Sequence, residues 1–139
     1  MNRLYRMTKE EFEKKKILYK FADTKYIVMD SAGIETYEQY FDRLWEVFGF
    51  SDIPEGWKKD YHTEYDFMTD MDELYENKYV FVIKNYDKFL PHNNWEKANL
   101  EDTYENYLLP FWDEEVERVV VEGKRKDFNI YLVSNSKVL

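Results

Sequence analysis

Residues 60–77 carry seven Asp or Glu side chains and no Lys or Arg, which makes this segment the best candidate for chemistry in the chain. Within it Asp66, Thr69, Asp70 and Glu73 stand at i, i+3, i+4 and i+7, the spacing that places side chains on one face of a helix. A stripe of this kind can present carboxylates to the Arg and Lys side chains of a cationic partner. The alternative interpretation is an ordinary solvated helix face.

The element that must position this stripe is a helix over about 63–75. Its other face carries apolar side chains suited to a core, so the polar stripe should point to solvent. Three further carboxylates flank the stripe and are expected to strengthen the negative field around it: Glu64, Asp72 and Glu76.

Composition restricts the classes of function that are open to the chain. Its 139 residues favour a single domain over 1–139, and without cysteine neither disulfides nor Cys-ligated zinc can form. The net charge of −9 argues against nucleic-acid binding. No apolar run is long enough to span a membrane, and the first 16 residues lack the apolar core of a secretion signal. We therefore expect a cytoplasmic protein that binds neither membrane nor nucleic acid and needs no cofactor.

The remaining pattern predicts a small α/β fold. Capping boxes at Thr8–Glu11 and Thr36–Gln39 open two further helices, and a fourth helical region at 102–122 should be interrupted near Pro110. Residues 85–100 contain turn formers and are expected to be irregular, and a hairpin could join 17–21 to 26–29. Apolar runs at 26–30, 79–84 and 128–133 are separated by helices, which predicts a three-stranded parallel sheet with helices packed on it.

Catalytic groups are scarce. The two histidines, His62 and His92, stand in no spacing that defines a reaction, although His62 and Asp66 form an i, i+4 pair. Only four glycines occur, and none forms a phosphate-binding loop. We predict no catalytic residues and no metal ligands. The alternative is a small acidic enzyme or regulatory domain that holds a metal or small molecule through 60–77.

Several tracts in their order along the chain resemble barstar-like proteins. They are the run Ile-Val-Met-Asp-Ser-Ala-Gly-Ile at 27–34, the capped helix with Leu44 and Phe48, the aspartates Asp66 and Asp70 four residues apart, the apolar strand 79–83, and the closing region 111–133. The resemblance covers about 25–134 and leaves 1–24 as an N-terminal extension. Tyr61-His62-Thr63-Glu64 stands where the family usually has Tyr-Gly-x-Asn, and Thr69 replaces the aromatic between the aspartates.

The resemblance implies an inhibitor, an immunity protein or antitoxin, that blocks the active site of a cationic ribonuclease or nuclease toxin with an acidic helix. A nuclease must present cationic groups to bind phosphates, and carboxylates at the phosphate positions would compete for those groups. The partner-binding residues that it implies are Tyr61, Asp66, Thr69, Asp70, Glu73 and Glu117.

Overall fold

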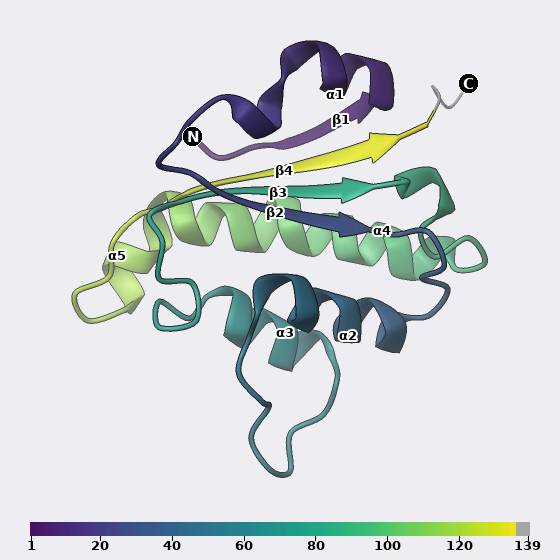
Figure 1. Cartoon of the computed structure of the whole chain (residues 1–139). Helices are drawn as coiled ribbons and strands as arrows, with labels where there is room; N and C mark the ends of the chain where they lie inside the picture. Colours follow the sequence, from purple (N-terminus) through teal and green to yellow (C-terminus); the bar gives the residue numbers. More distant parts are fainter. Residues whose placement is uncertain (136–139) are drawn as a thin grey trace.

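Four parallel strands form a single sheet in the computed structural model, which describes residues 1–135 (Figure 1). The strands are β1 (Leu4–Thr8), β2 (Lys25–Asp30), β3 (Lys78–Lys84) and β4 (Asp127–Ser134), and they lie in the order β1-β4-β3-β2. Each neighbouring pair is parallel. The predicted α/β class with a parallel sheet is therefore confirmed, but the predicted number of three strands is wrong.

The additional strand, β1, lies in the segment that we expected to be an N-terminal extension. It pairs with the outer edge of β4, with Leu4 opposite Ile130, and is thus an integral part of the sheet. The five residues of β1, with Arg6 at the centre, contain no continuous apolar run that would predict a strand. The strand forms because β4 offers it hydrogen-bonding partners more than 120 residues away along the chain, such as Ile130 N–H, which donates to the carbonyl of Arg3 at 3.0 Å.

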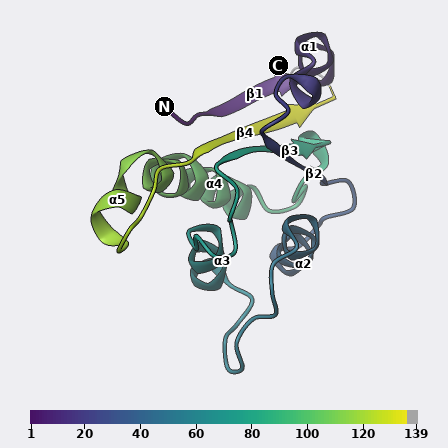
Figure 2. The ribbon, with the colours of Figure 1, turned by 60° about the vertical axis from the view of Figure 1, so that its left-hand side comes forward.

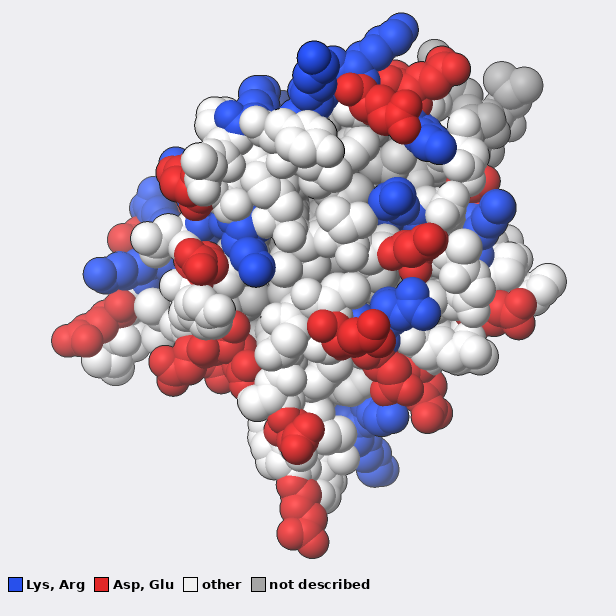
Figure 3. Space-filling model, viewed as in Figure 1, with Lys and Arg blue, Asp and Glu red and all other residues white. Residues whose placement is uncertain are grey.

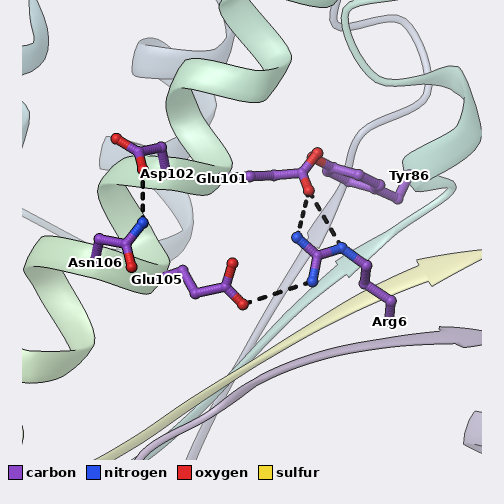
Figure 4. A network of polar contacts seen from close by, with 6 residues as sticks. All are labelled: Arg6, Tyr86, Glu101, Asp102, Glu105 and Asn106. Atoms are coloured by element: carbon purple, nitrogen blue, oxygen red, sulfur yellow. Dashed lines mark hydrogen bonds and ion pairs between the residues drawn. The ribbon is translucent and has the colours of Figure 1, made fainter.

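Arg6 also fixes β1 to the helical layer (Figure 4). Its Nη2 and Nε donate to one carboxylate oxygen of Glu101 at 2.6 and 3.2 Å, and Nη1 lies 3.7 Å from Glu105. The other oxygen of Glu101 accepts from the Tyr86 hydroxyl at 2.7 Å. A single Arg side chain thereby joins the edge strand to a helix that lies about 95 residues later in the sequence.

Helices cover the two faces of the sheet unequally (Figures 1 and 2). In the described part of the chain, one face carries only α1 (Lys9–Lys15) and the 3-10 turn η1 (Ile17–Tyr19). The hairpin proposed for 17–29 is therefore absent there. The other face carries α2 (Tyr37–Phe48), α3 (Tyr61–Met68) and the helical run that leads to β4. The capping boxes at Thr8 and Thr36 are both confirmed.

The helical run before β4 spans 94–119 and begins earlier than we expected. The turn η2 (Tyr86–Lys88) follows β3. The Asn93 side chain then accepts a hydrogen bond from the backbone N–H of Glu96 and begins α4 (Asn94–Thr103). The prediction that 85–100 is irregular is therefore wrong over its second half. Two π-helical segments, η3 (Tyr104–Leu108) and η4 (Phe111–Glu115), flank Pro110, which has no backbone N–H to donate. Helix α5 (Val116–Val119) ends the run. None of the helices within residues 1–135 is long and apolar enough to cross a membrane.

The main core lies between the sheet and the α2–α5 layer. The apolar pattern of the sequence predicts nine buried residues. Seven of them are buried: Phe41, Leu44, Met68, Val82, Ile83, Ile130 and Leu132. The other two, Phe48 and Met71, are only half-buried. The buried Trp112 donates its indole N–H to the Met68 carbonyl at 3.0 Å, and this contact fixes the end of α3 against the 94–119 run.

Asn2, a residue that is 8% exposed, offers a test of how β1 is attached to the sheet. Its amide donates to the Lys126 carbonyl at 2.9 Å and accepts from the Phe128 N–H at 2.8 Å. Asn2→Ala leaves both buried backbone groups without that partner and should lower the free energy of unfolding by about 1–3 kcal/mol, measured by urea denaturation. Asn106→Ala, which removes an exposed contact to Asp102 within one helical run, is the matched control. Equal midpoints for the two variants would contradict a structural role for the N-terminal segment.

Candidate functional site

Helix α3 is shorter than the sequence suggested, and this changes the geometry of the acidic segment. The Asp60 carboxylate accepts from the Thr63 N–H at 3.0 Å and starts the helix at Tyr61, two residues before the predicted start. The helix ends at Met68 instead of continuing to residue 75. Beyond it the Asp70 carboxylate accepts from the N–H of Asp72 at 2.8 Å, a local bond that competes with continued helix.

The prediction that Asp66, Thr69, Asp70 and Glu73 form one helical stripe is therefore wrong. Asp66 lies in α3, Thr69 is the residue that caps its carboxyl end, and the other two lie in the turns that follow. The Thr69 hydroxyl donates back to the Tyr65 carbonyl at 2.7 Å, so this side chain closes the helix and does not extend the stripe.

Three of the six predicted site residues nevertheless lie together. A shallow groove of about 570 Å³ runs between the end of α3 and the turn that follows α5. Its lining comes from three separate parts of the chain: Trp57, then Asp66, Thr69, Asp70, Met71 and Asp72, then Val120, Val121 and Glu122.

The other three predicted residues lie elsewhere, and each has an intramolecular partner. The Tyr61 hydroxyl donates to Glu96 on α4 at 2.6 Å, and Glu73 accepts from the backbone N–H of Ser51 at 3.3 Å as well as from the serine hydroxyl. Glu117 on α5 pairs with Arg125. The structure thus separates Tyr61, Glu73 and Glu117 from the groove.

The groove combines negative charge with exposed apolar surface. Four carboxylates line it (Asp66, Asp70, Asp72 and Glu122), and no Lys or Arg does. Trp57 is 43% exposed and Val121 is 94% exposed. An indole face beside carboxylates suits a guanidinium or ammonium group, which can form ion pairs and a cation–π contact at once.

Trp57, Val121 and Glu122 were not among the sequence-predicted site residues. Trp57 follows Pro54 and Gly56 in the loop between α2 and α3, and an exposed tryptophan in a loop is the one local signal that could have suggested it. Val121 and Glu122, with Val120, are about 50 positions from the remaining lining residues, so only the packing of the 94–119 run against α3, as in the Trp112–Met68 contact, brings them there.

The charge of the molecule is divided between its two ends. Figure 3 shows mostly Asp and Glu over the lower part of the molecule, where α2, α3 and the loop between them lie, and Lys and Arg beside a smaller acidic group at the top over α1. Residues 1–20 contain seven Lys or Arg against three Glu, whereas 60–77 contain seven carboxylates and no basic residue. The electrostatic field at the α3 end is therefore negative and attracts positive charge.

Glu64, which we expected to flank the stripe at the surface, is instead buried at 2% exposure. It points from α3 into the core, where its two carboxylate oxygens accept from the hydroxyls of Tyr37 at 2.8 Å and Tyr40 at 2.9 Å. The Tyr40 hydroxyl also bonds to that of Tyr104, so the cluster joins α2, α3 and the 94–119 run. This carboxylate supports the fold and cannot contribute an exposed charge to the groove.

Burial raises the pKa of Glu64 to about 7, and the two tyrosine hydroxyls oppose that shift by stabilising the carboxylate. The nearby Glu96 raises it further. Burial and the Glu64 charge in turn raise the pKa of the Tyr40 hydroxyl well above its usual range. The tyrosines therefore act as hydrogen-bond donors throughout the physiological range.

No protein-family model matches the sequence, and neither does any curated protein. Within residues 1–135, no three His, Asp or Glu side chains come together in an arrangement that could hold a metal ion.

The Glu64 cluster predicts a specific pH dependence of stability. Because its pKa is higher in the folded protein than in the unfolded chain, the folded state holds the proton more tightly, and stability decreases as pH rises from about 4.5 to about 7. A shift of this size corresponds to about 3 kcal/mol. Glu64→Gln removes that contribution. The free energy of unfolding of the variant minus that of the native protein should therefore become more positive as pH rises across this range.

The measurement is urea denaturation of both proteins at several pH values. Glu46→Gln, on the exposed side of α2, is the control and should follow the native profile at every pH. Parallel profiles for the native protein and Glu64→Gln would show that Glu64 titrates normally.

Proposed function

We propose that this protein is a barstar-like inhibitor that binds a cationic nuclease through the acidic groove beside α3. The observation that carries the proposal is the composition of the groove: Asp66, Thr69 and Asp70 lie together there with exposed Trp57, and no basic side chain is in the lining. A surface that blocks a nuclease active site must complement the charge of the cleft, and a nuclease cleft is lined with the cations that bind phosphate.

The positions of the two aspartates support a binding role. Asp66 is held on a helix whose opposite face is buried, and the Asp70 carboxylate is oriented by the N–H groups of Asp72 at 2.8 Å and Glu73 at 3.4 Å. Groups held in this way lose little conformational freedom on binding, so more of the interaction energy contributes to affinity. Asp66 also has His62 3.5 Å away, a neighbour that a cationic partner could displace.

The binding surface differs from the single acidic helix that the resemblance implies. Its carboxylates come from the end of one helix, a turn and a second turn after α5. A concave surface of this kind suits an Arg or Lys side chain that projects from the partner and inserts between Trp57 and the carboxylates. Tyr61, Glu73 and Glu117 are not needed for this contact.

The direct test is inhibition of RNA cleavage by a panel of cationic ribonucleases and nuclease toxin domains. We expect the native protein to inhibit at least one of them, and Asp70→Asn to weaken that inhibition by about 30-fold, which corresponds to about 2 kcal/mol. Asparagine keeps an oxygen for the Asp72 N–H and removes only the charge, so the fold should be unaffected. Glu46→Gln, a neutralised carboxylate outside the groove, should inhibit normally.

Two outcomes would contradict the proposal. In one, no enzyme in the panel is inhibited by equimolar protein. In the other, Glu46→Gln and Asp70→Asn weaken inhibition equally, and the effect would then come from net charge and not from the groove.

The charge distribution also predicts the kinetics of binding. Between 10 and 150 mM salt the Debye length falls from about 30 to about 8 Å, so the association rate with the inhibited nuclease should fall steeply while the dissociation rate changes much less. Neutralising Asp72 and Glu122 together should lower the association rate and reduce its dependence on salt, as measured by stopped-flow fluorescence. An association rate that is insensitive to both salt and these substitutions would place the binding surface elsewhere.

A further inference from the structure

A second cavity, of about 390 Å³, lies on the opposite side of the sheet from the α2–α5 layer. Its walls are formed by α1 and η1 on one side and by the carboxyl-terminal halves of β2, β3 and β4 on the other. The apolar side chains of the lining are Phe12, Ile17, Leu18, Tyr19, Val28 and Val133. A cavity of this volume lies within the range of small-molecule sites.

The cavity exists because α1 is too short to cover its face of the sheet. The helix has seven residues, and among residues 1–135 the buried members of the core beneath it are Phe12, Ile17, Val82 and Val133. Beside it Val28 of β2 remains 37% exposed and Tyr19 remains 89% exposed. An apolar surface is therefore left accessible next to a helix that does not fill the space.

The charged part of the lining is mainly cationic. Lys9, Lys16 and Lys84 contribute to it, against the single carboxylate of Glu13. In the part of the chain that the structure describes, no carboxylate lies within ion-pair distance of any of these three lysines. They are consequently available to an anionic group at the mouth of the cavity.

The position of the cavity in the fold is also typical of a ligand site. Ligands of open parallel α/β sheets bind outside the carboxyl ends of the strands. Here Lys84 and Asn85 lie at the carboxyl end of β3, and Val133 and Asn135 lie at that of β4. Two residues of the lining lie at the ends of helical segments and have positive φ angles: Lys16, at 47°, ends α1, and Asn85, at 55°, precedes η2.

We infer that this cavity binds a small amphipathic anion, with its apolar part against Phe12, Val28 and Val133 and its carboxylate, sulfate or phosphate at the three lysines. An entirely apolar ligand would leave the lysines without a role, and a small inorganic anion would leave the apolar wall in contact with water. The site is independent of the acidic groove and of the nuclease-binding proposal.

The probe is octanoate, titrated into the full chain and followed by heteronuclear NMR and calorimetry. Octanol and acetate are the matched controls, because the first lacks the charge and the second lacks the apolar chain. We expect octanoate to bind and to perturb the amide signals of Phe12, Val28 and Val133, and octanol and acetate to bind at least fivefold more weakly. Equal binding of octanol would overturn the role of the lysines, and absence of octanoate binding by the folded protein would overturn the site itself.

Variants locate the two halves of the interaction. Lys16→Gln and Lys84→Gln should each weaken octanoate binding by about twofold to fivefold, whereas Lys58→Gln, in the loop between α2 and α3, should not change it. Val28→Trp, at a partly exposed strand position, should fill the cavity and abolish binding while the far-UV circular dichroism spectrum stays unchanged. Unchanged affinity in the two lysine variants, or in Val28→Trp, would overturn the assignment.

A lipid surface could supply the same chemistry, so one experiment separates the sources. Flotation with vesicles of anionic phospholipid should leave the protein in the unbound fraction, because the cavity accommodates one small ligand. Binding to vesicles without binding to octanoate would overturn the proposal in favour of membrane attachment through α1.

Discussion

Parallel pairing of all four strands is the constraint on which the rest of this structure depends. Parallel neighbours cannot be joined by a tight turn, so every connection has to cross a face of the sheet and usually does so as a helix. The connections from β2 to β3 and from β3 to β4 both use the same face, and only the short connection from β1 to β2 uses the other. The thick helical layer, the thinly covered opposite face and the two candidate sites all follow from this division.

The helical layer is held together by a buried polar cluster as well as by apolar packing. Glu64 accepts hydrogen bonds from two tyrosines of α2, and Tyr104 extends the cluster to the 94–119 run. A buried carboxyl group would be costly without such donors, and here each oxygen has one. Because Glu64 and Asp66 are two residues apart on α3, the same helix directs one carboxylate to the core and another to the groove.

The two proposed sites have opposite charge and lie on different layers of the molecule. The groove beside α3 is lined by four carboxylates, and the cavity under α1 is lined by three lysines. Such a distribution orients an approaching cationic protein, because its field attracts at one end and repels at the other. A small anion bound under α1 would reduce the positive charge at that end without touching the groove. Occupation of one site therefore does not obstruct the other.

The sequence by itself determined the features that depend on neighbouring residues: the α/β class, the two capping boxes, the strands β2, β3 and β4, and the acidity of residues 60–77. Local hydrogen bonds and periodicity are sufficient for these, because all the interacting groups lie within a few positions. Only the tertiary structure decided the rest. Strand β1 needs the edge of β4 as its hydrogen-bonding partner. Glu64 points inward because tyrosine hydroxyls of α2 donate hydrogen bonds to it. Helix α3 ends at Met68, whose carbonyl accepts a hydrogen bond from the indole of Trp112. The groove unites residues from three distant segments, and their proximity depends on packing that no single stretch of sequence encodes.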